Sequence, residues 1–184
     1  MAFGRGPTGA FARCGGWGPA FGDEGSGAWL GRRALSVVTA AHDGREPETA
    51  LTGAVLTALD LSDVSDLIAW AAHASPATFA TLAPVVMAVA QGGDLRANSL
   101  VTMAVEELVL HVRTLSRQLF VDERASFPLA FSGGLLTGRS LVRKRLLSRV
   151  KTALPGAHVR EEPVVPVRGA VRSGLRALSA RVAR

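Results

Sequence analysis

The chain has 184 residues, of which 48% are apolar and 20% are charged, and its formal net charge is +6. This composition is typical of a globular protein and excludes an intrinsically disordered chain. No apolar run reaches the roughly 18–20 residues that a membrane-spanning helix needs, and the first residues lack the pattern of a secretory signal. The single cysteine, Cys14, excludes an internal disulfide, so we expect the cytoplasm, a reducing compartment.

The charge is concentrated at one end of the sequence. Residues 1–138 carry 9 basic and 13 acidic side chains, whereas residues 139–184 carry 12 basic and 2 acidic side chains. A basic tail can bind nucleic acid, but no aromatic residue follows Phe131 to stack on a base. We therefore interpret the tail as helices with arginine on the solvent side, and we expect neither nucleic acid nor membrane as a partner.

The first two thirds of the sequence predict a hairpin followed by helices. Residues 1–5 and 10–14 alternate small and apolar side chains around the turn signal GPTG. Asp23 stands where the N-cap of the next helix is expected, and Gly44 is expected to end that helix. Further helices are predicted over residues 46–61, 64–75 with Ser62 as N-cap, 76–94 with Pro76 in the first turn, and 95–121.

The last third predicts a βαβ unit. An apolar strand over residues 127–136 ends in paired glycines, and a helix over 140–154, an extended segment over 156–166 and a closing helix over 168–184 follow. Strands joined through a crossover helix run parallel, and helices then cover the sheet. The predicted class is therefore α/β with a large helical insertion.

Two glycine-rich stretches are candidate binding sites. The first, GGWGPAFGDEGSG at residues 15–27, has six glycines around Trp17, Asp23 and Glu24. Glycines let backbone amides approach a ligand, an indole offers a flat apolar wall, and a carboxylate accepts hydrogen bonds from hydroxyl groups. These groups suit a small sugar. The alternative is a tight turn in which Asp23 only caps the helix and Trp17 lies in the core.

The second stretch is FSGGLL, residues 131–136. Ligands of α/β proteins bind beyond the carboxyl ends of parallel strands, so a strand that leads into Gly133 and Gly134 is a candidate nucleotide site. The stretch matches neither the P-loop nor the GxGxxG pattern. An ordinary turn between strand and helix is the alternative.

The remaining titratable residues predict no further site. The four histidines (His42, His73, His111 and His158) are scattered without metal-ligand spacing, so no metal site is expected. Cys14 is interpreted as a small buried residue near the loop. Asp94 is expected to cap the helix over 95–121.

The stretch GGWGPAFGDEGSGAWLGRRAL resembles the N-acetylglucosamine kinase / BadF-BadG-BcrA-BcrD ATPase family. AQGGD, FSGGLL and PVVPVRGAVRSGL are similar to further segments of that family, and the resemblance extends over nearly the whole chain. It implies the C-terminal lobe of a ribonuclease H-like, actin-like ATPase fold. Within this lobe, residues 1–22 would form the hairpin and sugar-site loop, 23–124 a mainly helical segment, and 125–184 a strand–helix–strand–helix segment on the nucleotide side.

The resemblance also assigns site residues. Gly16, Trp17, Gly18 and Asp23 would contact the amino sugar, with Glu24 and Gly25 holding the turn that aims Asp23. Gly133 and Gly134 would lie against the adenosine of ATP, and Ala90 would lie near it.

The sequence also departs from the family pattern. Residues 1–184 contain neither the DGGGT-type nor the GTGS-type phosphate loop of the family, and no residue matches the family's general base. ATP and Mg²⁺ are therefore implied by the resemblance, whereas most of their phosphate and metal ligands are missing, and no catalytic residue is assigned. Phosphoryl transfer depends on positioning and charge neutralisation at the γ-phosphate, so the chain alone is expected to turn over little or not at all.

The sequence therefore predicts part of an ATP-dependent kinase for N-acetylglucosamine or glucosamine. The alternative is a non-catalytic sugar-binding or regulatory module derived from that family. Self-association, or pairing with a separate N-terminal lobe, is expected from apolar surface that such a lobe would expose.

Overall fold

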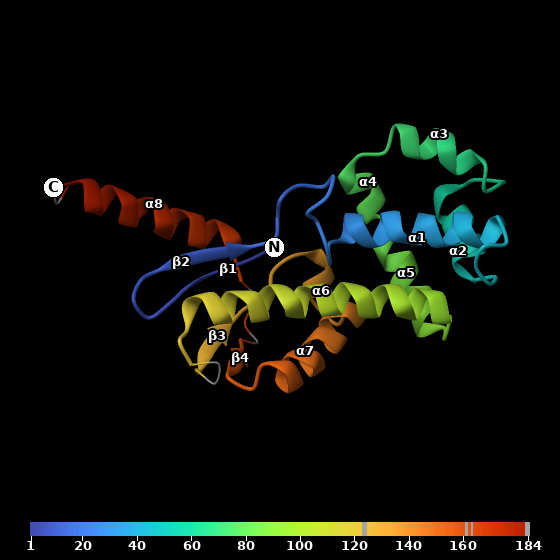
Figure 1. The fold of residues 1–184 in the computed structure, drawn as a ribbon. Helices are drawn as coiled ribbons and strands as arrows, with labels where there is room; N and C mark the ends of the chain where they lie inside the picture. Colours follow the sequence, from blue (N-terminus) through green and yellow to red (C-terminus); the bar gives the residue numbers. More distant parts are fainter. Residues whose placement is uncertain (123–124, 161, 163, 183–184) are drawn as a thin grey trace.

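The structure is a computed structural model that describes all residues except 123–124, 161, 163 and 183–184. Two short sheets and a set of helices form an α/β arrangement (Figure 1). In chain order the elements are β1 (Ala2–Arg5), β2 (Phe11–Cys14), α1 (Gly27–His42), α2 (Leu51–Leu59), α3 (Asp66–Ala72), α4 (Pro76–Ala80), α5 (Ala83–Gln91), α6 (Leu95–Leu119), β3 (Phe127–Leu129), the 3₁₀ turn η1 (Gly134–Leu136), α7 (Leu141–Ala153), β4 (Ala157–Val159) and α8 (Pro166–Val182).

The predicted hairpin is confirmed. β1 pairs antiparallel with β2, and Ala2 faces Cys14 across the pair. Alternation along the strands places Phe3 and Phe11 on the exposed face, with their ring centroids 6.4 Å apart. The other face packs against α6, where a Cβ on Gly4 would lie 2.9 Å from the Leu119 side chain.

The predicted βαβ unit is also confirmed, with shorter strands than expected. β3 and β4 pair parallel, with Phe127 opposite Ala157, and α7 is the crossover between them. The strand predicted over 127–136 ends at Leu129, and the extended segment predicted over 156–166 contributes only three residues to the sheet. Pro166 begins α8, a position that suits proline because the first helical N–H has no partner in the helix.

The helix predicted over residues 76–94 is wrong as a single element. α4 ends at Ala80 and α5 begins at Ala83, with Pro84 in its first turn. Proline has no N–H to donate to the preceding turn, and its ring clashes with the carbonyl four residues earlier, so a continuous helix breaks before it.

The N-cap predicted at Ser62 is also wrong. α3 begins at Asp66, and in the preceding turn the Asp63 carboxylate accepts a hydrogen bond from the Ser65 amide at 2.8 Å. Hydrogen bonding from the Ser65 side chain, together with this bond from its amide, lowers the pKa of Asp63. The cap predicted at Asp94 is confirmed, because the Asp94 carboxylate accepts the Ala97 amide at 2.8 Å.

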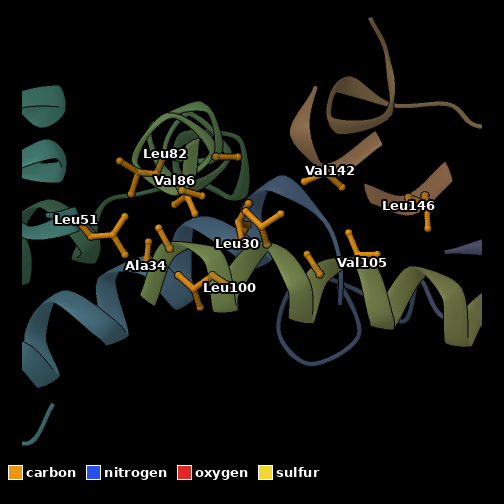
Figure 2. Packing of buried hydrophobic residues seen from close by; sticks show 14 of the residues in the cluster. Leu30, Ala34, Leu51, Leu82, Val86, Leu100, Val105, Val142 and Leu146 are labelled. Carbon is orange, nitrogen blue, oxygen red and sulfur yellow. The ribbon is translucent and has the colours of Figure 1, made fainter. Parts of the chain in front are cut away.

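α6 runs along the middle of the molecule and packs against α1, α5, α7 and the hairpin (Figure 1). Its buried side chains recur at helical spacing, so one long stripe contacts several neighbours. Figure 2 shows the resulting core, in which buried side chains of α1, α2, α5, α6 and α7 pack together; the labelled members are Leu30, Ala34, Leu51, Leu82, Val86, Leu100, Val105, Val142 and Leu146. No helix in the described part of the chain combines the length and apolarity that crossing a bilayer requires.

Candidate functional site

The glycine-rich stretch after β2 forms a loop that folds back on itself before α1. Gly15, Gly16 and Gly18 have φ values of +71°, +72° and +114°, which residues other than glycine rarely adopt. The Trp17 amide donates to the Gly22 carbonyl at 3.0 Å, and the Gly22 amide donates to the Gly18 carbonyl at 2.9 Å. These two bonds close a small loop with Trp17 at its base.

The Trp17 side chain is 69% exposed, so the core position that was one alternative for it is excluded. The guanidinium carbon of Arg13 lies 5.0 Å from the centre of the indole ring, within range of a cation–π contact. A Cβ on Gly22 would lie 2.4 Å from the Trp17 Cβ, which only glycine avoids. The loop therefore holds a flat apolar ring at the surface.

Asp23 is not the N-cap that the sequence predicts. Ser26 caps α1 instead, with its hydroxyl oxygen accepting the Trp29 amide at 3.0 Å. The chain turns once more at Gly25, whose φ is +74°, and the Asp23 carbonyl accepts the Ser26 amide at 3.1 Å. The extra turn moves the true cap three residues along the chain, so the Asp23 carboxylate does not cap the helix.

The Asp23 carboxylate instead forms an ion pair with Arg32 of α1, with 3.7 Å between Oδ2 and Nη2. About a third of the Asp23 side chain remains exposed to solvent. The Arg32 guanidinium also lies over the Phe79 ring of α4, 5.7 Å from its centre. A carboxylate held in this way can still accept hydrogen bonds from the hydroxyl groups of a ligand.

The second stretch forms an open turn between β3 and α7. Gly133 has a φ of +113° and Gly134 begins η1, and a Cβ added to either glycine would meet nothing within 4 Å. The turn is tied to the start of α7: the Ser140 hydroxyl donates to the Leu135 carbonyl and accepts the Arg143 amide. Arg143 Nη1 donates to the Leu136 carbonyl at 2.9 Å. The glycine backbone is therefore exposed while the chain after it is held in place.

Ala90 occupies a different environment from the two glycines. It is only 4% exposed, and its carbonyl accepts the Asn98 side-chain amide at 2.8 Å and the Gly93 amide at 3.1 Å. The methyl group lies in the core and the carbonyl is used inside the fold. Its contact with a nucleotide stays a prediction.

Comparison with known proteins identifies the family. Residues 2–173 match the model of the BadF/BadG/BcrA/BcrD ATPase family. The chain belongs to this family. It is 31% identical to the N-acetyl-D-glucosamine kinase of Dictyostelium discoideum over 92% of this chain and 54% of that protein. It is 32% identical to the N-acetylmuramic acid/N-acetylglucosamine kinase of Clostridium acetobutylicum over 74% of this chain and 45% of that protein.

A solved structure supports the same assignment. A crystal structure of a Chromobacterium violaceum protein that carries the name N-acetylglucosamine kinase superposes with a TM-score of 0.69 and 35% sequence identity. The match covers 84% of this chain and 50% of that one. This chain of the BadF/BadG/BcrA/BcrD ATPase family thus spans about half the length of the relatives it matches.

The two stretches do not line the two hollows found along α6, and they contribute to no cluster of metal ligands among the residues that the structure describes. Within the residues that the structure describes, no three His, Cys, Asp or Glu side chains come together as metal ligands. Shallow hollows of about 200 Å³ lie along α6, one of them lined by Glu106, Glu107 and Arg113. Neither Trp17 nor Gly133 lines them.

Sequence reasoning missed the residues that support the first stretch. Arg32 pairs with Asp23, and His111 of α6 lies directly beneath Gly15. Arg32 lies nine residues from its partner and His111 lies 96 residues away, so no local spacing rule connects them. The only signal for His111 was its place on the helical stripe of α6 together with Ala104 and Leu108.

Proposed function

We propose that this member of the BadF/BadG/BcrA/BcrD ATPase family is part of an ATP-dependent amino-sugar kinase that acts on N-acetylglucosamine or glucosamine. One observation carries the proposal: the loop that contains the GGWG and GDEGS motifs presents an exposed indole and a partly exposed carboxylate that does not cap the helix. The relatives named as N-acetylglucosamine kinases support the choice of sugar.

The sugar would bind at the loop between β2 and α1. The Trp17 ring supplies an apolar face for the sugar ring, and the Asp23 carboxylate accepts hydrogen bonds from its hydroxyl groups. Gly18 leaves the backbone after the indole open to a ligand, because a Cβ there would meet nothing within 4 Å. The backbone before the indole is less open, since a Cβ on Gly16 would lie 2.6 Å from the Met1 sulfur. Glu24 and Gly25 form the turn that follows Asp23.

The nucleoside would bind at the turn that begins with Gly133. The exposed backbone of Gly133 and Gly134 fits the flat face of an adenosine because no side chain covers it. Ala90 is kept as a predicted neighbour of the nucleoside, although its buried methyl group would present no exposed side chain to it. ATP would supply the phosphoryl group that is transferred to the sugar.

The residues of the two stretches do not supply the groups that would bind the phosphates of ATP or a metal ion. Residues 1–184 contain no DGGGT or GTGS motif, and the described residues present no cluster of three metal-ligating side chains for Mg²⁺. We place the general base and the phosphate loops in another segment of the active enzyme. In this view the chain is one lobe of an actin-like ATPase fold, with a sugar-side segment at 1–22, a helical insertion within 23–124 and a nucleotide-side segment at 125–184.

A sugar-binding module without kinase activity is the second candidate. The observation that favours it is the combination of an open Trp17 and Asp23 with the absence of both phosphate-loop motifs from residues 1–184. The two functions differ in whether nucleotide alters sugar binding.

Titration calorimetry of the purified chain with N-acetylglucosamine, with and without ATP, tests the proposal. We expect sugar binding that Trp17→Ala and Asp23→Asn each weaken by about tenfold or more, the loss of one good polar or stacking contact. Ile68→Ala is the matched control, because Ile68 is also a large exposed apolar residue but lies on α3.

The outcomes separate the candidates. A chain that does not bind the sugar, or binds it equally well after both loop substitutions, contradicts the sugar site. Sugar affinity that changes with ATP supports the kinase, whereas sugar affinity that ATP leaves unchanged supports the module.

A further inference from the structure

Both ends of the loop formed by residues 15–25, the glycine loop, pack against one face of α6. Ala104, Leu108 and His111 are spaced by four and three residues, so their side chains lie above one another on the helix. A Cβ on Gly15 would lie 2.1 Å from His111 Nε2. A Cβ on Gly25 would lie 2.8 Å from Leu108 Cγ and 3.1 Å from the Ala104 carbonyl. The backbone therefore lies against α6 two residues before Trp17 and again two residues after Asp23.

The His111 ring is fixed from within its own helix. His111 is only 7% exposed, and its Nδ1 lies 2.6 Å from the Glu107 carbonyl oxygen. Because a carbonyl can only accept, Nδ1 carries the proton of this hydrogen bond. The bond sets the orientation of the ring, and the opposite edge, with Nε2, faces Gly15.

This arrangement differs from ordinary core packing. A leucine would fill the same space, but it has several rotamers and no hydrogen bond to hold one of them. The imidazole offers a flat, oriented edge to a backbone that has φ +71° and no side chain. Close contact with a rigid group reduces the freedom of a glycine-rich loop, whose backbone entropy is otherwise high.

We infer that His111 is a positioning residue for the glycine loop. Its oriented ring holds Gly15, while Leu108 and Ala104 hold Gly25. The indole of Trp17 and the carboxylate of Asp23, which lie between these two points, therefore keep a fixed separation. The inference rests on the proposed function only in taking this loop as the place where the sugar binds. In this role His111 does not touch the sugar.

Amide hydrogen exchange of residues 15–25, measured by mass spectrometry on the full chain, tests the support directly. We expect His111→Ala to speed exchange in this loop by about tenfold or more, because local opening becomes easier. The matched control is Leu100→Ala, which removes a buried side chain from the same helix about 16 Å further along its axis, at a rise of about 1.5 Å per residue. This control should leave loop exchange nearly unchanged under conditions in which both variants are folded.

A second variant approaches the same contact from the loop. Gly15→Ala places a methyl group against the imidazole without altering the core, so it keeps the test open if His111→Ala does not fold. It should speed loop exchange by more than Gly18→Ala does, because Gly18 also has a positive φ but a Cβ there would meet nothing within 4 Å. Since an alanine at φ +71° strains the backbone by itself, the double variant should exchange somewhat faster than His111→Ala alone, but by less than two independent effects would give, because the ring that the methyl group strikes is gone.

Calorimetry with N-acetylglucosamine supplies the functional readout. We expect His111→Ala to raise the sugar Kd by about tenfold, a coupling of ordinary size for two connected groups, while Leu100→Ala leaves it unchanged. Loop exchange that is no faster in His111→Ala than in Leu100→Ala overturns the inference, and so does faster exchange with an unchanged Kd. A wild-type chain that fails to bind the sugar refutes the proposed function instead, and the exchange experiment still decides whether His111 holds the loop.

Discussion

At the scale of single residues, some glycines of this chain lie where a side chain would clash with a neighbour, and others lie where a side chain would fit. Gly31, inside α1, faces α4 so closely that a Cβ would lie 2.0 Å from the Phe79 carbonyl. Gly53, inside α2, is exposed, and a Cβ there would meet nothing within 4 Å. The same substitution should therefore have opposite effects on stability at the two sites.

We predict that Gly31→Ala lowers the free energy of unfolding by about 1–3 kcal/mol, the usual cost of overpacking a close contact. Gly53→Ala should raise it by up to about 1 kcal/mol, because alanine loses less backbone entropy in a helix. Urea unfolding followed by circular dichroism measures both values. Equal effects of the two substitutions would show that α1 and α4 do not approach each other as described.

Asp94 joins the starts of two helices through one carboxylate. Oδ1 accepts the Ala97 amide, and Oδ2 accepts the Thr49 hydroxyl and the Ala50 amide, each at 2.9 Å. Burial by itself raises the pKa of Asp94, but these hydrogen bonds together lower it below its ordinary value. The ionised form is therefore the one that stabilises the fold.

This direction predicts a pH dependence. With a lowered pKa in the folded state, the contribution of Asp94 is complete above the unfolded pKa of about 3.9 and is lost as the pH falls through the folded pKa. Asp94→Asn should cost about 1–3 kcal/mol at pH 7, because the amide keeps only one of the two acceptor oxygens and leaves a donor of Thr49 or Ala50 unpaired, and the difference from wild type should shrink below about pH 4. Unfolding curves of both proteins from pH 7 to pH 3 measure it. A constant difference would contradict the assigned role.

At the scale of elements, α6 and α7 are held together by contacts of unequal value. Leu146 of α7 is fully buried between the two helices and their neighbours (Figure 2). Arg149 of α7 forms a two-pronged ion pair with Glu106 of α6, but both side chains stay nearly half exposed. Water and salt weaken such a pair, whereas they do not replace buried apolar contacts.

We predict that Leu146→Ala lowers the free energy of unfolding by about 2–5 kcal/mol, and that Arg149→Ala lowers it by less than about 1 kcal/mol. The small effect of Arg149→Ala should vanish in about 1 M sodium chloride, at which charges are screened over about 3 Å. Denaturation at low and high salt compares the two variants. A larger loss for Arg149→Ala would mean that the ion pair is protected from solvent.

At the scale of the whole molecule, the hairpin and α8 lie at the end opposite α2 and α3 (Figure 1). Both carry exposed apolar side chains there, with Phe3 and Phe11 on the hairpin and Val167 and Val171 on α8. Exposed apolar area of this kind favours association. The basic residues of the C-terminal segment oppose the approach of two copies, because like charges repel at low salt.

We therefore predict that the chain self-associates and that salt strengthens the association. Sedimentation velocity over a range of protein concentrations measures it. Replacing Val167 and Val171 together by lysine should return the protein to the monomer, with a melting temperature within a few degrees of wild type, as for surface substitutions in general. A monomer at all concentrations and salt levels would contradict the prediction.

Local rules were sufficient for much of this fold. The alternation around GPTG predicted the hairpin, and the helical spacing of apolar residues predicted α1 and α6 nearly to their ends. The glycine pair after a strand, followed by a helix and a second strand, predicted the parallel pairing of β3 and β4. The motifs around Trp17 indicated the family, which the match over residues 2–173 confirms. Each of these signals lies within a short window, where backbone preference and side-chain spacing act directly.

Contacts between distant residues decided the rest. Ser26 rather than Asp23 caps α1 because the chain turns again at Gly25, and this turn lies against Leu108 of α6. His111 supports Gly15 only because packing brings α6 beneath the hairpin and its loop. The sequence alone determined which segments form helices, strands and glycine turns, since those choices depend on neighbouring residues. The tertiary structure decided how the loop of residues 15–25 is held, since that depends on which distant side chains the core brings together.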